Sequence, residues 1–214
     1  MTCAALMLIQ HHPAEGPGEI ANWAAARGIT LQIFRADLQQ LPLASNAALI
    51  LLGGPYSAHS ELAWLQQERT WLRACLDLGA PVWAICLGAQ LLALALGGEV
   101  ESMPQDECGW CEIRFSDGQT LEVLAWHEDR FLPPAGVPLL AQSKLCRQQM
   151  AQYSQQRIGL QFHPEWNASS VAELNDFFGA ASPLPRDVDH QRFARVAEWL
   201  HQQLDRWLQA SEPA

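Results

Sequence analysis

The sequence predicts an α/β fold: a mostly parallel sheet with helices on both faces and a β-rich elaboration at one edge. Short, continuously apolar runs alternate with amphipathic stretches through the first half of the chain, as expected for parallel strands joined by crossover helices. Turn residues, mostly glycine and proline, separate these runs. The second half has shorter runs with close turns, which is typical of additional, locally paired strands.

The first half contains four predicted strands and three predicted helices. The apolar runs predicted as strands are residues 4–9, 30–34, 47–52 and 81–85. The predicted helices are residues 19–27, 61–78 and 87–96. A glycine follows each helix, at Gly28, Gly79 and Gly97, where a helix commonly ends.

The second half predicts the sheet edge and a final helix. Short strands are predicted at residues 109–115, 120–125, 137–141 and 147–153, before a buried strand at residues 158–162. Apolar residues recur at helical spacing over residues 188–209. We expect this helix to pack on its own domain, with a homodimer or partner surface as the alternative. Because no linker or repeat interrupts the chain, one domain spanning residues 1–214 is the simplest account.

Charge and composition exclude several classes of function. The formal net charge of −10 opposes binding to phosphate backbones, so we expect no nucleic-acid partner. The apolar run at residues 4–9 is too short for a signal peptide or a membrane span, so we expect a cytoplasmic protein with free thiols. Cys108 and Cys111 form one C-x-x-C pair, whereas zinc usually takes four ligands. We therefore expect no metal site and no cofactor.

Cys86 stands where the strand at residues 81–85 meets the helix at residues 87–96. Ala84 and Gly88 flank it, and a sharp strand-to-helix turn needs such small neighbours. That turn exposes the thiol at the carboxyl edge of the sheet, where open α/β folds bind ligands. The helix N-terminus favours the thiolate, and the Leu87 N–H points toward an oxyanion formed next to Cys86. The pattern predicts a nucleophile; a buried structural cysteine is the alternative.

His163 and Glu165 follow the buried strand at residues 158–162, so they too are expected at the carboxyl edge. Pro164 prevents the strand from continuing. Glu165 can reach back to the imidazole and fix its tautomer, which predicts a Cys86–His163–Glu165 triad. His163 would then deprotonate Cys86 and later protonate the leaving amine. Gly54 is the expected second oxyanion donor, because glycine lets the backbone turn an N–H inward.

Three motifs occur in the order found in class I glutamine amidotransferases, which the chain resembles. They are Gly53-Gly54-Pro55, Ile85-Cys86-Leu87-Gly88-Ala89-Gln90 and Phe162-His163-Pro164-Glu165. The resemblance implies a flavodoxin-like domain that hydrolyses the γ-carboxamide of glutamine through a γ-glutamyl thioester on Cys86. It also implies that Gly54 and Leu87 are the oxyanion donors and that Gln90 contacts glutamine.

Further stretches resemble the free-standing GMP synthase-like group of these proteins. They are Gln10-His11, Glu15-Gly16-Pro17-Gly18 and Trp126-His127-Glu128-Asp129. The resemblance implies that Trp126, His127 and Asp129 border the substrate pocket. Two residues depart from the family pattern, since Ala84 and Glu128 each stand where glycine is usual. The loop around Glu128 is therefore expected to differ in shape from that of the family. His11, just past the first strand, is a minor candidate for the pocket.

No phosphate-binding loop occurs, and the residues after Trp166 are too few for an ATP-dependent synthetase domain. We therefore expect released ammonia to pass to a separate synthetase or acceptor subunit, unless hydrolysis is itself the purpose. A γ-glutamyl peptide hydrolase would use the same triad, and the sequence leaves that alternative open. A non-catalytic binding or regulatory module is the third hypothesis; the intact triad argues against it.

Overall fold

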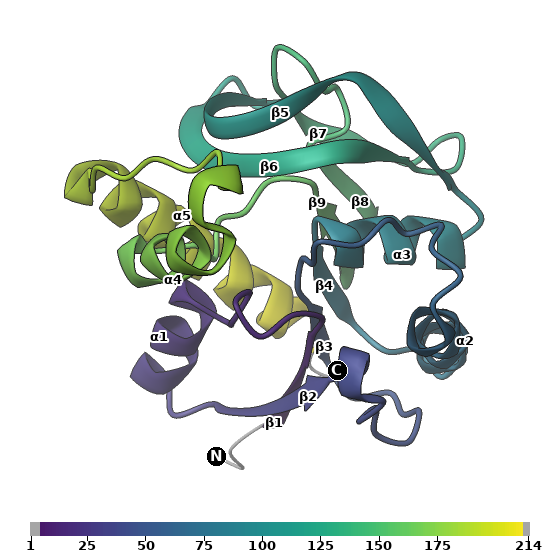
Figure 1. The fold of residues 1–214 in the computed structure, drawn as a ribbon. Coiled ribbons are helices and arrows are strands. Elements are labelled where there is room, and N and C mark those ends of the chain that lie inside the picture. Colours follow the sequence, from purple (N-terminus) through teal and green to yellow (C-terminus); the bar gives the residue numbers. More distant parts are fainter. Residues whose placement is uncertain (1–4, 212–214) are drawn as a thin grey trace.

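The computed structural model describes residues 5–211, so Cys3 and residue 4 of the first predicted strand lie outside the described residues (Figure 1). The strands are β1 (Ala5–Gln10), β2 (Thr30–Arg35), β3 (Leu49–Leu51), β4 (Val82–Ile85), β5 (Glu99–Phe115), β6 (Thr120–Leu132), β7 (Leu139–Gln142), β8 (Met150–Ser154) and β9 (Arg157–Leu160). The α-helices are α1 (Glu19–Ala26), α2 (Ala63–Asp77), α3 (Leu87–Ala95), α4 (Ala168–Phe178) and α5 (His190–Ser211).

The strands of this part of the chain form one nine-stranded sheet in the order β2-β1-β3-β4-β9-β8-β7-β5-β6. Strands β2, β1, β3, β4 and β9 run parallel to one another and are called the parallel half. Strands β8, β7, β5 and β6 pair antiparallel and are called the antiparallel half. The predicted α/β fold with a parallel core and a β-rich edge is confirmed.

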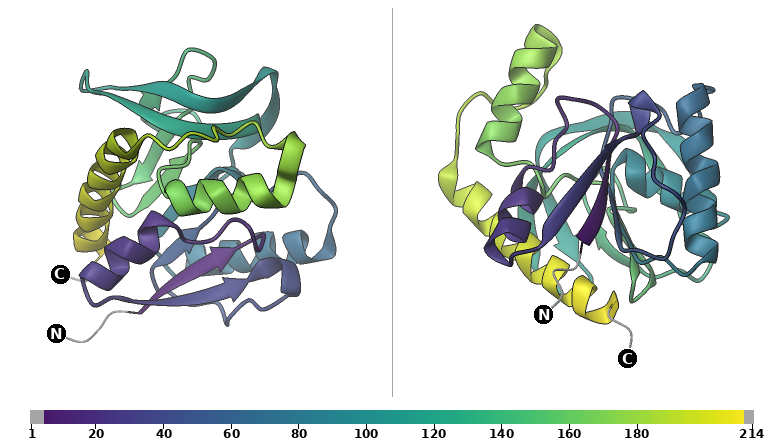
Figure 2. Two further views of the ribbon diagram at one scale, coloured as in Figure 1. Left: turned by 60° about the vertical axis from the view of Figure 1, so that its left-hand side comes forward. Right: turned by 90° about the horizontal axis from the view of Figure 1, so that it is seen from below.

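The parallel half is covered on both faces, because successive side chains of a strand point to opposite sides. Leu49 and Leu51 of β3 pack with residues of α2 and α3, whereas Ile50 and Leu52 pack with residues of α1 and α5. Figures 1 and 2 show the two helix layers on either side of the sheet. The continuous apolar runs of the sequence follow from this double burial.

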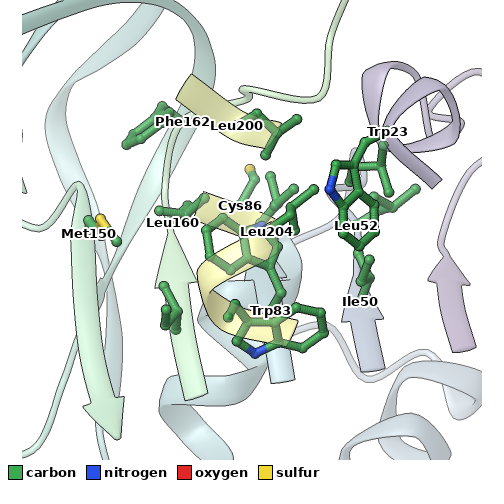
Figure 3. Packing of buried hydrophobic residues seen from close by; sticks show 14 of the residues in the cluster. Trp23, Ile50, Leu52, Trp83, Cys86, Met150, Leu160, Phe162, Leu200 and Leu204 are labelled. Atoms are coloured by element: carbon green, nitrogen blue, oxygen red, sulfur yellow. The ribbon is translucent and has the colours of Figure 1, made fainter. Parts of the chain in front are cut away.

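Helix α5 covers the α1 side of the sheet with one apolar face, close to the predicted range of residues 188–209. Its buried residues are Val196, Leu200, Leu204 and Trp207. Figure 3 shows Leu200 and Leu204 in the same cluster as Trp83, Leu160 and Cys86. The helix therefore packs on its own sheet, as expected.

Two parts of the fold differ from the sequence prediction. Strands β5 and β6 are much longer than residues 109–115 and 120–125, and they pair from Glu99↔Leu132 to Arg114↔Thr120. Helix α4 was not predicted; it begins after Asn167, whose side-chain oxygen accepts a hydrogen bond from the Ser170 N–H. No helix within residues 5–211 is long and apolar enough to cross a membrane.

Candidate active site

Cys86 lies between β4 and α3 in a strained backbone conformation. Its φ is 50°, and Gln39 is the other non-glycine residue with positive φ among residues 5–211. Such a conformation costs about 1–3 kcal/mol, so it persists only where the surrounding structure imposes it. The Cys86 N–H donates to the Leu160 oxygen at 2.7 Å, which ties the turn to β9.

Small neighbours make the turn sterically possible, as predicted. A Cβ on Gly88 would lie 2.6 Å from both the Cβ and the carbonyl oxygen of Leu51, so α3 can approach β3 this closely only with glycine there. Ala84 is fully buried in β4, paired with Leu51, so the sheet accommodates the methyl group that departs from the usual glycine.

His163 and Glu165 meet at the same edge of the sheet. The Nδ1 of His163 lies 2.7 Å from the Glu165 Oε1, and both side chains are almost completely buried. Because the carboxylate accepts a hydrogen bond from Nδ1–H, the other ring nitrogen, Nε2, is left for Cys86. The structure thus brings together all three residues of the predicted triad.

The charges around His163 favour its protonated form. Burial lowers the pKa of His163, but the charges of Glu165 and Cys86, with hydrogen bonds to both, outweigh burial and raise the pKa to about 10. The arrangement therefore suits an imidazolium held between Glu165 and Cys86. Gln161 also donates through Nε2 to the Cys86 Sγ at 3.6 Å, which adds a hydrogen bond to the sulfur.

The His163 ring is fixed from two further directions. Trp166 stacks on it with a centroid separation of 3.6 Å and an interplanar angle of 9°. The His163 backbone N–H donates to the Leu124 oxygen of β6 at 2.9 Å. Trp166, beyond the end of β9, and Leu124 of the antiparallel half therefore hold His163 in place.

The predicted oxyanion donors lie next to this group. Leu87 is the first residue of α3, so its N–H has no partner within the helix. Gly53 is wedged against the candidate triad: a Cβ there would lie 2.7 Å from the His163 Cε1 and 2.8 Å from the Glu15 Oε2. A Cβ on Gly54 would lie 2.8 Å from the His11 Cβ, so both glycines are sterically required.

A pocket of about 230 Å³ opens over these groups. The predicted site residues that line it are Gly54, Cys86, Leu87, Gln90, Trp126, His127, Asp129 and His163. Glu165 lies behind His163. The Gln90 Nε2 donates to the Asp129 carbonyl at 3.4 Å, and the Asp129 carboxylate accepts from the Ser102 hydroxyl at 2.8 Å.

The segment Trp126-His127-Glu128-Asp129 is part of strand β6, not of a loop. It faces Ser102 and Glu107 of β5 across an irregularity in their pairing. Glu128 is exposed at the pocket rim, so the side chain that replaces the usual glycine is accommodated in solvent.

Several site residues were not predicted. Glu15, Trp166 and Phe178 line the pocket, and Gln161 contacts the thiol. Gln161 had a signal, because it lies two residues before His163 and therefore on the same side of an extended chain. Phe178 had none, since it depends on the unpredicted α4.

Glu15 adds a buried carboxyl group to the site. Burial raises the pKa of Glu15 from 4.5 to about 7; the charge of His163 opposes this shift and the charge of Glu165 adds to it. The C-x-x-C pair lies elsewhere, on β5, and burial raises the pKa of Cys111 to about 12. Within residues 5–211, no group of three or more His, Cys, Asp or Glu side chains is placed to hold a metal ion.

The chain is similar to one known protein family and to several individual proteins. Residues 18–178, more than half of the chain, match the family described as "Glutamine amidotransferase class-I". A glutamine-hydrolysing GMP synthase subunit from Saccharolobus solfataricus is 34% identical over 61% of this chain and 77% of its own length. The glutamine amidotransferase-like protein YfeJ from Salmonella typhimurium is 29% identical over 92% of this chain and 91% of its own. A crystal structure of a glutamine amido transferase from Methylobacillus flagellatus is 27% identical, with a TM-score of 0.88 over 100% of this chain and 97% of that one.

Proposed function

Because the chain belongs to the class I glutamine amidotransferase family, we propose that it hydrolyses the γ-amide of glutamine with Cys86, His163 and Glu165 as its catalytic triad. One observation carries this proposal. A histidine held by a carboxylate at 2.7 Å presents its second nitrogen to a cysteine on a strained turn, inside a pocket.

The first half of the reaction releases ammonia. The Cys86 thiolate attacks the amide carbon, and the N–H groups of Gly54 and Leu87 stabilise the negative oxygen that forms. As the carbon–nitrogen bond breaks, the imidazolium of His163 gives its proton to the leaving nitrogen, so that NH₃ departs and a γ-glutamyl thioester remains on Cys86.

The second half restores the enzyme. Neutral His163 takes a proton from water, and the resulting hydroxide attacks the thioester carbon. The carbon–sulfur bond then breaks, which releases glutamate as its γ-carboxylic acid and returns the thiolate next to the imidazolium. The released carboxyl group gives its proton to solvent. Glu165 keeps its negative charge throughout and stabilises the charged ring.

The pocket lining supports a substrate with a free ammonium group. Glu15, Glu128 and Asp129 are among its residues, and no Lys or Arg among residues 5–211 lines it. Gln90, Trp126 and His127 complete the proposed substrate contacts. A γ-glutamyl peptide hydrolase is the alternative, since it forms the same thioester and differs only in the leaving amine.

We further propose that residues 1–214 act as one domain that passes ammonia to a separate acceptor. The relative from Saccharolobus solfataricus is named as one subunit of a glutamine-hydrolysing synthase, so its partner would hold the synthetase activity. By this analogy, a synthetase subunit is the expected partner of this chain.

The test is hydrolysis of L-glutamine and of a panel of γ-glutamyl dipeptides, with ammonia and glutamate quantified against a Cys86→Ala control. Turnover of glutamine that is lost in the control supports the glutaminase reaction. Turnover of the dipeptides alone supports the peptide hydrolase. If neither is hydrolysed and Cys86 does not react with a glutamine-like electrophile, the chain is a non-catalytic module.

A further inference from the structure

Behind the Gly53–Gly54 segment lies a second histidine–glutamate pair that the reaction above does not use. The His11 Nε2 is 2.8 Å from the Glu68 Oε1, and both side chains are fully buried. His11 follows β1 and Glu68 belongs to α2, and neither lines the pocket. Burying such a pair is costly, so its position calls for an explanation.

The other nitrogen of His11 contacts the proposed oxyanion segment. The His11 Nδ1 lies 3.0 Å from the Gly53 carbonyl oxygen, which can only accept a hydrogen bond. Nδ1 must therefore carry a hydrogen. The contact with Glu68 secures this, because Nδ1 keeps its hydrogen whether the shared proton lies on the His11 Nε2 or on the carboxylate.

Fixing the Gly53 oxygen also fixes the Gly54 N–H. Residues 5–211 contain no cis peptide bond, and in a trans peptide the C=O and the following N–H point in opposite directions. Since the Gly53 oxygen points at His11, the Gly54 N–H points away from it. Gly54 lines the pocket, and its N–H has no acceptor among the described residues, so it is available to a ligand.

Two consecutive glycines would not hold this orientation by themselves. Glycine has access to backbone conformations that other residues avoid, so the peptide between Gly53 and Gly54 can also turn over. The reversed peptide would present the Gly53 carbonyl oxygen to the developing oxyanion and repel it. A fixed donor on the opposite side is therefore needed.

We propose that His11 and Glu68 are positioning residues that hold the Gly53–Gly54 peptide with its N–H toward the substrate carbonyl oxygen. This inference rests on the proposed amide hydrolysis. It concerns only the step in which an oxyanion forms, so it separates two properties of Cys86: its nucleophilicity, and its ability to react with an amide.

The test compares two double variants in one background. Glu68→Gln is the reference, because its amide can donate to the His11 Nε2 and leaves no buried carboxylate unpaired. Adding His11→Asn keeps an N–H donor near the position of Nδ1, whereas adding His11→Leu removes it. All three proteins are compared with wild type on whichever amide, glutamine or a γ-glutamyl dipeptide, wild type hydrolyses fastest.

We expect His11→Leu in this background to lower kcat by about 10²-fold relative to Glu68→Gln, which is the effect of losing one oxyanion donor. His11→Asn should recover most of that loss. Alkylation of Cys86 by iodoacetamide forms no oxyanion, so its rate should stay within about threefold across all the variants. Near-ultraviolet circular dichroism checks that each variant is folded.

Three results would overturn the inference: hydrolysis by the His11→Leu variant at the reference rate, equal losses with Asn and Leu, or an alkylation rate that falls as far as hydrolysis. If the His11→Leu double variant does not fold, His11→Met in the same Glu68→Gln background replaces it, since methionine also lacks an N–H donor and should give a similar loss. Wild type that hydrolyses no amide contradicts the proposed function itself, and the inference falls with it.

Discussion

Besides the His11–Glu68 pair, two buried histidine–glutamate pairs each place their histidine in the lining of the pocket, and they differ in which hydrogen-bonding atoms remain unpaired. His163, beyond the parallel half, bonds Glu165 through Nδ1 and directs Nε2 at Cys86. His127, in the antiparallel half, has both nitrogens occupied: Nδ1 by the Asp129 carbonyl at 3.0 Å and Nε2 by Glu107 at 3.1 Å.

The carboxylates differ in the same way. Glu107 accepts hydrogen bonds from His127, Ser143 and Gln149, whereas Oε2 of Glu165 has no partner among the described residues. A saturated pair, one with both ring nitrogens bonded, has no nitrogen free to exchange protons with a substrate, while a pair with one nitrogen directed at a thiol can transfer protons. The chemistry of a histidine–carboxylate pair therefore depends on what the second ring nitrogen of the histidine, the one that does not contact the carboxylate, is bonded to.

The largest expected effect comes from replacing each of the two histidines in turn. His163→Asn should lower kcat/KM for amide hydrolysis by about 10⁴-fold, because it removes the proposed general acid and base. His127→Asn, as the matched control, should lower kcat by less than about tenfold. Steady-state kinetics with both variants measures the difference. Comparable losses at the two positions would contradict the assigned roles.

The next effect concerns stability at the saturated pair. Glu107→Leu should lower the free energy of unfolding by about 3–5 kcal/mol, since it leaves His127, Ser143 and Gln149 without their buried acceptor. Burial raises the pKa of Glu107, but hydrogen bonds from these groups outweigh burial and lower the pKa below 4.5. Its stabilisation is therefore present above pH 4.5 and is lost as the pH falls below that value.

Urea unfolding of wild type and Glu107→Leu at pH 7 and at pH 3 measures this. The difference in stability should be largest at pH 7 and should shrink at pH 3. A difference that does not change with pH would mean that the Glu107 charge contributes nothing.

Glu15 should show the opposite dependence on pH. Because burial raises its pKa from 4.5 to about 7, the folded state holds the proton more tightly than the unfolded state does. Wild type should therefore lose about 2–3 kcal/mol of stability between pH 4.5 and pH 7.5 relative to Glu15→Gln. Urea unfolding of both proteins at several pH values across this range tests the prediction. If their stabilities change with pH in the same way, the pKa of Glu15 is not raised in the folded state.

The smallest effect sharpens the comparison within the antiparallel half. Asp129→Ala removes a carboxylate from the pocket wall but leaves the proposed triad in place. We expect KM to rise about tenfold with kcat within about threefold, the signature of lost uniform binding. Steady-state kinetics on the preferred amide decides this; a fall in kcat with unchanged KM would assign Asp129 to the reaction instead.

The same division explains what could be predicted from the sequence. In the parallel half, double burial produces unbroken apolar runs, and the strand ends place Cys86 and His163 at one edge, so local pattern and site coincide. In β5, residues before Gly109 are rich in Glu and Asp, so this part of the strand lacks the apolar alternation from which its pairing with β6 could be predicted. Helix α4 was missed because its start depends on the Asn167 cap, a side-chain contact that the apolar pattern does not reveal.

His11 and Glu68 show a further limit of sequence patterns. They are 57 positions apart, and only the packing of α2 against the end of β1 brings them together. Partners joined across elements carry no local spacing that a pattern could detect. The role proposed for them follows from the direction of one peptide bond, which requires coordinates.

The positive φ of Cys86 bears on natural selection as well as on chemistry. Glycine adopts that backbone conformation without steric strain, so exchanging Cys86 for glycine would remove about 1–3 kcal/mol of strain while also removing a buried thiol from the core. Selection for low backbone strain alone would therefore not favour a cysteine at this turn. Cys86 occupies this position although its backbone conformation is strained.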